Sequence, residues 1–100
     1  MSAKRPAATP IQHVDNERTR VTEWRFAPGE ATGWHRHEYD YVITPVTDGK
    51  VLIVGPDGLE TEAEMIAGRS YYRAAGVEHD VINAGDAELR FVEVEWKPAG

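Results

Sequence analysis

The residues with the clearest chemical potential are two histidines, His35 and His37, in the stretch GWHRHEYDY at positions 33–41. In an extended chain, residues two apart point to the same face, so both imidazoles share a face with Tyr41 while charged side chains occupy the other. A buried, unpaired ring nitrogen costs about 1 to 3 kcal/mol, and a divalent cation would satisfy both rings. An isolated H-x-H is more often an exposed or hydrogen-bonded pair, so the rest of the chain has to supply partners.

The elements that would position these histidines are short strands. Stretches rich in β-branched and aromatic residues are separated by turn signals, and Asp48-Gly49 and the PDG at 56–58 predict hairpins. The predicted strands are residues 21–26, 39–46, 50–54, 59–65, 70–73, 78–83 and 89–96, with an extended segment over 34–44 around the histidines. No segment has apolar residues repeating every three to four positions, the spacing of an amphipathic helix. The fold class predicted is therefore all-β, a small antiparallel sandwich or barrel.

The last predicted strand, residues 89–96, has an irregular apolar pattern. Its apolar residues change phase from Leu89 and Phe91 to Val92 and Val94. A change of phase predicts a β-bulge or burial on both faces of the strand.

Length and composition limit the classes of protein that this chain can be. It has 100 residues, a formal net charge of −6 and no cysteine. We expect a Pro/Ala-rich flexible arm over residues 1–10 and one domain over 11–97. The negative charge argues against nucleic acid and anionic membrane as partners. The absence of cysteine excludes disulfides and thiolate ligands. Without a signal-like or transmembrane apolar run, the expectation is a soluble cytoplasmic protein.

The segment around the first histidines resembles the first motif of the cupin family, small jelly-roll barrels, also called double-stranded β-helices, that hold a metal in their interior. That motif places H-x-H between two glycines. Gly29, His35, His37 and Gly49 match it. The resemblance implies that both histidines are metal ligands.

The segment GRSYYRAAGVEHDVIN at 68–83 resembles the second cupin motif. Gly68, Gly76, His79 and Asn83 fall at the spacing of that motif, and Ala74 stands where proline is usual. His79 is the third ligand that the resemblance implies. The glycines are interpreted as turn residues with positive φ, and Asn83 as a structural residue that closes a turn.

One position departs from the family pattern. The usual glutamate of the first motif falls at Tyr41 or Val42, and neither is a carboxylate. Asp40 lies slightly earlier and, by alternation, on the outer face, from which only a bulge would turn it inward. Tyr41 shares the histidine face. We therefore predict metal ligation by the three histidines alone and take Tyr41 and Asp40 as the candidate catalytic residues for proton handling.

A ligand set without a carboxylate limits which metal ions the site can bind. Mg²⁺ and Ca²⁺ require oxygen ligands, so His35, His37 and His79 predict one divalent transition metal: Fe, Mn, Ni, Cu or Zn. The resemblance implies a metal-dependent, dioxygenase-like oxidoreductase acting on a small polar metabolite. It leaves open a non-enzymatic small-molecule or metal-binding accessory module of a catabolic pathway, or an isomerase. Small cupins also resemble proteins that form homodimers, here through residues 11–14 added to the partner's sheet.

Several other residues allow two interpretations. Arg69 and Arg73 are suited to holding a substrate carboxylate, and equally to a solvated strand edge. Trp24, Met65, Tyr72 and Phe91 are suited to lining a pocket, and equally to packing inside a barrel.

Overall fold

The computed structural model describes residues 5–99, which form two antiparallel sheets and contain no helix. The strands are β1 (Thr9–Asp15), β2 (Thr19–Phe26), β3 (His35–Arg36), β4 (Asp40–Pro45), β5 (Gly49–Val54), β6 (Glu60–Met65), β7 (Tyr71–Arg73), β8 (Glu78–Asn83) and β9 (Leu89–Trp96). One sheet has the order β1-β2-β9-β4-β7 and the other the order β3-β8-β5-β6. The predicted all-β antiparallel class is confirmed. The described residues accordingly offer no helix that could cross a membrane.

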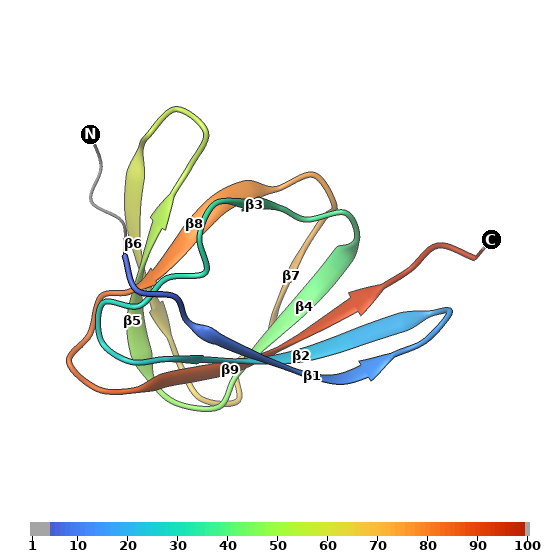
Figure 1. The fold of residues 1–100 in the computed structure, drawn as a ribbon, viewed down its shortest axis with the longest axis horizontal. Coiled ribbons are helices and arrows are strands. Elements are labelled where there is room, and N and C mark those ends of the chain that lie inside the picture. The colour runs from blue at the N-terminus through green and yellow to red at the C-terminus, as the bar shows by residue number, and fades with distance from the viewer. Residues whose placement is uncertain (1–4, 100) are drawn as a thin grey trace.

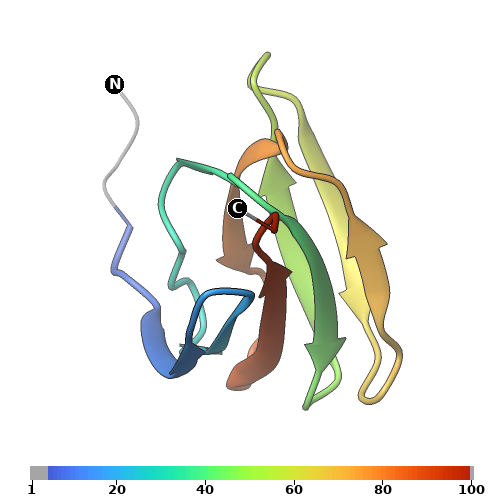
Figure 2. The ribbon, with the colours of Figure 1, turned by 90° about the vertical axis from the view of Figure 1, so that its right-hand side faces the viewer.

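The two sheets form the walls of a small barrel. Figure 1 shows β2 and β9 of the five-stranded sheet on one side, with β3 and β8 of the other sheet across from them. Figure 2, turned by 90°, shows β9 and β4 side by side, in agreement with their pairing from Asp40–Trp96 to Pro45–Phe91. The interior between these walls contains both the apolar core and the histidines.

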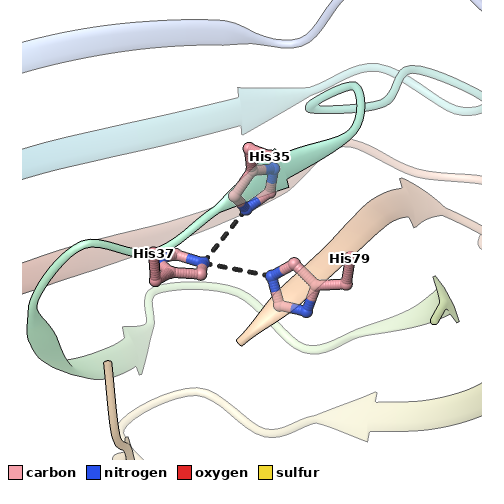
Figure 3. A group of neighbouring side chains, drawn as sticks. All are labelled: His35, His37 and His79. Atoms are coloured by element: carbon pink, nitrogen blue, oxygen red, sulfur yellow. Dashed lines mark hydrogen bonds between the residues drawn. The ribbon is translucent and has the colours of Figure 1, made fainter. Parts of the chain in front are cut away.

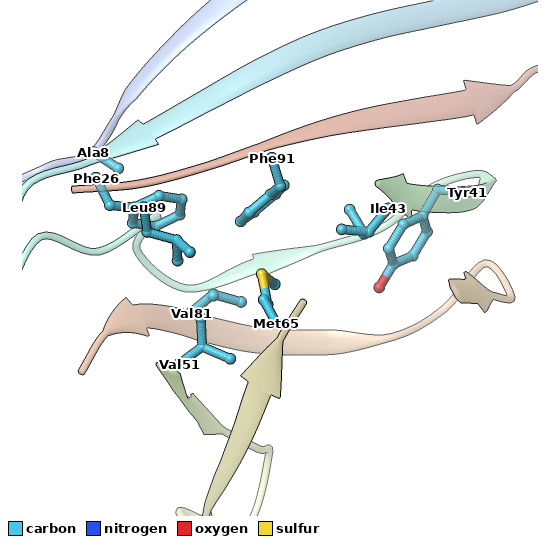
Figure 4. Close-up of a cluster of buried hydrophobic side chains, with 9 residues drawn as sticks. All are labelled: Ala8, Phe26, Tyr41, Ile43, Val51, Met65, Val81, Leu89 and Phe91. Atoms are coloured by element: carbon cyan, nitrogen blue, oxygen red, sulfur yellow. The ribbon is translucent and has the colours of Figure 1, made fainter. Parts of the chain in front are cut away.

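The apolar core fills one end of the barrel. Phe26 and Phe91 pack with ring centroids 5.4 Å apart. Figure 4 shows the whole buried cluster, drawn from both sheets: Ala8, Phe26, Tyr41, Ile43, Val51, Met65, Val81, Leu89 and Phe91. Complete burial of such a side chain stabilises the fold by about 1.5 to 3 kcal/mol. Tyr41 lies at the edge of the cluster that faces the histidines.

The connection at Asp48-Gly49 differs from the predicted hairpin. It links β4 of the five-stranded sheet to β5 of the four-stranded sheet, so the chain crosses between the walls here. A Cβ on Gly49 would lie 2.5 Å from Cδ1 of Leu89, a fully buried side chain. A side chain at position 49 would have to displace the end of Leu89, because the crossing backbone passes directly over this core residue. The hairpin predicted at the PDG turn is present between β5 and β6.

The extended segment predicted over residues 34–44 is also divided. β3 ends at Arg36 in the four-stranded sheet, and β4 starts at Asp40 in the five-stranded sheet. The chain therefore turns between the sheets just after His37. A single continuous strand was wrong, because the backbone leaves one ladder before it joins the next. The predicted alternation of faces is nevertheless present: His37, Tyr41 and Ile43 are buried, whereas Arg36, Glu38 and Asp40 are exposed.

The N-terminal residues lie closer to the domain than the expected arm over residues 1–10. β1 begins at Thr9 and pairs with β2 of the same chain. Ala8 is 7% exposed, belongs to the core and donates its backbone N–H to the Ala31 carbonyl. Residues 1–4 of the arm lie outside the described residues. The strand expected to join a partner's sheet is paired within its own chain.

Candidate metal centre

Three imidazoles converge at one point between the sheets (Figure 3). Nε2 of His37 lies 3.0 Å from Nε2 of His35 and 3.1 Å from Nε2 of His79. His37 is buried, and the other two rings are half-buried. The structure therefore brings together all three histidines that the two motifs predict as ligands.

The backbone explains why the three rings meet. His35 on β3 stands directly opposite His79 on β8 in the antiparallel ladder, and such cross-strand partners point to the same face. His37 follows β3, and its N–H donates to the carbonyl of Val77 while its carbonyl accepts the N–H of Gly76 at 2.8 Å. Gly76 has φ +100°, a conformation that favours glycine and permits this close return of the chain.

The outer nitrogens of two rings fix where the inner lone pairs point. Nδ1 of His35 lies 2.9 Å from the carbonyl oxygen of Gly33, which can only accept a hydrogen bond. Nδ1 of His37 lies 3.3 Å from a carboxylate oxygen of Glu93. Each Nδ1 therefore carries the proton, and each Nε2 presents a lone pair to the shared point. Two lone pairs 3.0 Å apart repel each other unless a positive charge lies between them.

The spacing of these nitrogens fits a shared ion. Histidine nitrogens bind divalent transition metals at about 2.0 to 2.1 Å, and ligands about 90° to 110° apart on such an ion lie about 3.0 to 3.4 Å from each other. The observed separations of 3.0 and 3.1 Å from His37 to His35 and His79 fall in this interval. The geometry and donor set suit a divalent transition-metal ion.

Two of the three rings, His37 and His79, are held in the protonation state that binds metal. Burial, followed by the neighbouring charge of His35, lowers the pKa of His37 to about 4. Burial and the other two histidines likewise lower the pKa of His79 to about 4. Both side chains are neutral at pH 7 and have free lone pairs, so a metal does not have to displace protons from them.

A buried glutamate on β9 completes the surroundings of His37. Glu93 is 7% exposed, contacts Nδ1 of His37 and accepts a hydrogen bond from the Trp24 indole N–H at 3.3 Å. Burial, and then the charge of Glu95, raises the pKa of Glu93 to about 7. Positive charge at the histidine cluster would favour its ionised form. Glu93 can orient the His37 ring and balance the charge of a bound ion from outside the ligand set.

The sequence analysis missed this glutamate because it interpreted the pattern of residues 89–96 as a bulge or two-faced burial. β9 instead pairs with β2 and β4 without a register shift and alternates regularly. Glu93 and Glu95 take the inward positions that follow Leu89 and Phe91. The missed signal was the strict alternation itself, which places two glutamates inside the barrel.

The second inward glutamate has its own partner. Arg20 donates from Nε to Glu95 Oε1 at 2.7 Å and from Nη2 to Oε2 at 2.9 Å, a bidentate pair. This pair raises the pKa of Arg20 above its usual range, chiefly through the hydrogen bond to Glu95. Because the two charges neutralise each other, Glu95 is not available to a metal or a ligand.

The two candidate catalytic residues lie in different places. The Tyr41 ring stacks on the His37 imidazole with centroids 3.9 Å apart and is 2% exposed. Asp40 is exposed, and its carboxylate accepts the Ala75 backbone N–H at 2.8 Å. No bulge turns Asp40 inward, since its pairing with β9 is regular. The structure therefore brings Tyr41, but not Asp40, to the histidines.

A cavity of about 730 Å³ opens beside the histidines. All three imidazoles, Tyr41 and Glu93 line it, and its apolar wall includes Trp24, Ile43, Ile53, Met65, Tyr71 and Phe91. Trp24, Met65 and Phe91 thus line a pocket, as one of the two sequence interpretations proposed, whereas Tyr72 is 55% exposed and does not line it. The volume is sufficient for a small organic molecule beside the metal site.

Comparison with known proteins gives one closely similar curated relative. The beta-alanine degradation protein BauB of Pseudomonas aeruginosa is 55% identical over 93 residues, which cover 93% of this chain and 97% of that protein. Its name associates it with the degradation of an amino acid.

Solved structures share the fold. A cupin domain from Bordetella pertussis Tohama I superposes with a TM-score of 0.91 at 52% identity, covering 97% of this chain and 100% of that one. A protein with a double-stranded β-helix domain from Klebsiella pneumoniae, at 20% identity, superposes with a TM-score of 0.73, covering 93% and 79% of the two chains. The family model for the cupin domain matches residues 22–95. The chain belongs to the cupin family.

Proposed function

We propose that this protein is a metal-dependent oxidoreductase of the dioxygenase type that acts on a small polar metabolite at His35, His37 and His79. The observation that carries the proposal is the convergence of three Nε2 atoms, two of them 3.0 Å apart with lone pairs aimed at the same point. Iron, manganese, nickel, copper and zinc all suit this donor set.

A transition metal held by these rings supplies Lewis acidity and, if redox-active, a route for electrons between substrate and dioxygen. The remaining work falls to the protein. Glu93 holds the His37 ring through Nδ1, and the apolar cavity wall excludes water around the substrate. Burial raises the pKa of Tyr41 above its usual range, so its hydroxyl stays protonated at neutral pH and acts as a donor.

The similarity to BauB supports a role in catabolism. Because 97% of that protein aligns with this chain at 55% identity, both share the whole domain. We propose that the substrate is a small intermediate of amino-acid or related catabolism.

The test is reconstitution followed by measurement of oxygen uptake. The purified, tag-free protein is stripped with chelator, loaded anaerobically with Fe(II) and assayed in an oxygen electrode against small thiols, diketones, amino acids and keto acids. We expect about one metal per chain and uptake with one substrate class. The His79→Ala variant is the matched control and should lose both metal and uptake.

Two results would contradict the proposal in different ways. Metal binding without oxygen uptake, for any metal and substrate class tested, would favour the accessory binding module or the isomerase. Absence of metal from the reconstituted wild-type protein would remove the metal site itself.

We also propose that the protein is a cytoplasmic homodimer. The outer face of the five-stranded sheet carries an apolar row with one side chain per strand: Val14, Val21, Val94, Val42 and Tyr72, which are successive cross-strand partners. Val14 and Tyr72 are 39% and 55% exposed. A twofold axis would place this row against its own copy. Light scattering should give twice the chain mass for the wild type and the single mass for Val94→Glu.

A further inference from the structure

Three arginines line the cavity beside the histidines, and two of them are engaged by acidic partners. Arg20 is held bidentately by Glu95, and Nε of Arg36 lies 3.9 Å from Oε1 of Glu78. Among residues 5–99, Arg73 forms no ion pair with any acidic side chain. Arg73 is therefore the cavity cation whose charge the protein leaves uncompensated.

Arg73 lines the cavity from β7 and is exposed, so it lies at the rim that opens to solvent. It stands opposite Tyr41 in the ladder between β4 and β7, so both side chains lie on the cavity face of the sheet. Its guanidinium lies over the Tyr71 ring, 4.7 Å from the centroid, and Nη1 donates to the Tyr72 carbonyl at 2.9 Å. These contacts restrain the side chain and leave most of its donors free.

Arg73 shares one cavity with the histidine cluster. The three imidazoles, Tyr41 and Arg73 all line it. Tyr41, the ladder partner of Arg73, stacks on the His37 ring with centroids 3.9 Å apart. Arg73 and the candidate metal centre thus belong to one site.

The part of the cavity between the Arg73 guanidinium and the candidate metal centre has apolar walls. Ile43, Met65 and Phe91 line the same cavity as Arg73 and the imidazoles. A molecule that fits has one anionic end for the guanidinium, an apolar middle and one polar end for the metal. A single guanidinium matches a carboxylate in bidentate geometry. Glu38 and Glu78, which also line the cavity, disfavour a doubly charged phosphate.

We propose that Arg73 binds the carboxylate of a small monocarboxylate substrate whose other end reaches the three-histidine centre. The inference rests on the proposed function and names the substrate class for the same site. It accounts for an uncompensated arginine at the rim of a cavity whose other arginines are paired.

The experiment measures binding of simple probes rather than turnover. Propionate and butyrate are titrated into the metal-loaded protein by calorimetry, with propionamide and butyramide as neutral controls of nearly the same shape. We expect the acids to bind and the amides to bind at least about tenfold more weakly, as for loss of a hydrogen bond to a charged group. Arg73→Gln should weaken the acids by about 10- to 100-fold, and Arg73→Lys should retain part of the affinity.

Arg69→Gln is the matched control, because Arg69 is exposed and does not line the cavity. It should bind the acids as the wild type does. Thermal melting and metal content are measured for every variant, so that a folding defect is separated from a binding defect.

Equal binding of acids and amides, no binding of acids to the wild type, or undiminished binding by folded Arg73→Gln would overturn the proposal. The last result would mean that the carboxylate binds the metal alone. Failure of the proposed function would instead be seen as missing metal or missing oxygen uptake.

Discussion

The carboxylate of Glu93 lies 3.3 Å from Nδ1 of His37, on the opposite side of the ring from the Nε2 atom that faces the other two histidines. A carboxylate at this position fixes the proton on Nδ1, keeps the lone pair on Nε2 and increases its basicity. The strand that supplies it, β9, belongs to the sheet opposite His35 and His79. The glutamate missing from the first motif is thus replaced by a carboxylate that acts through a histidine.

Glu93→Gln should weaken metal binding by about 10- to 100-fold, the usual effect of losing such a partner. Competition with a chromophoric chelator measures the affinity, and ¹⁵N NMR of the metal-free protein reports the proton position on His37. Glu95→Gln is the matched control, since Glu95 is buried on the same face but pairs with Arg20. It should lower the melting temperature without changing the affinity. Equal affinities for Glu93→Gln and the wild type would exclude this role.

His79→Ala should release the metal and remove the stabilisation that the metal provides. At free metal about 100 times Kd, a bound ion adds about 2.7 kcal/mol to the free energy of unfolding. Elemental analysis and thermal melts with and without added metal measure both effects. His13→Ala is the control, because His13 is exposed and contacts Glu23 rather than the centre. Retention of one metal by His79→Ala would remove this residue from the site.

Tyr41→Phe and Asp40→Asn separate the two candidate catalytic residues. Tyr41→Phe keeps the ring that stacks on His37, so metal content and melting temperature should stay close to those of the wild type while turnover falls. Asp40→Asn should leave turnover nearly unchanged, because this side chain caps the Ala75 N–H on the outside. Steady-state oxygen uptake on the identified substrate decides between them. The opposite ranking would transfer proton handling to Asp40.

The metal-free protein should lose stability as the pH falls from about 6.5 to about 4. Folding lowers the pKa of His37 and His79 from 6.5 to about 4, so the unfolded chain binds more protons in this interval and stability rises with pH. Folding raises the pKa of Glu93 to about 7, so this one carboxyl makes stability fall with rising pH and offsets part of the effect of the two histidines. Urea unfolding at several pH values measures the slope, which should steepen in Glu93→Gln. A free energy of unfolding that does not change between pH 4 and 6.5 would contradict this prediction.

The sequence predicted the parts of the site that depend on local pattern. Gly68 and Gly76 have positive φ, as the motif interpretation requires. Asn83 closes its turn by accepting the Gly85 N–H and donating to the Phe26 and Ala87 carbonyls. The convergence of the histidines followed from two motifs that each lie within one short segment.

The parts that the sequence did not predict depend on contacts between distant segments. Alternation along β9 places Glu93 inside the barrel, but its polar partners, Trp24 and His37, lie far away in the chain. The division of residues 34–44 between two sheets depends on which ladder each half joins. Neither the partners of Glu93 nor this division is encoded in a local pattern of apolar and polar residues.

The turn after His37 gives the centre a mechanical consequence. His35 and His79 belong to one wall of the barrel, while the ring of His37 contacts Glu93 on the opposite wall. An ion bound by the three rings would therefore link the two walls of the barrel. Separating the walls would then require breaking either a metal–histidine bond or the contact between Glu93 and His37.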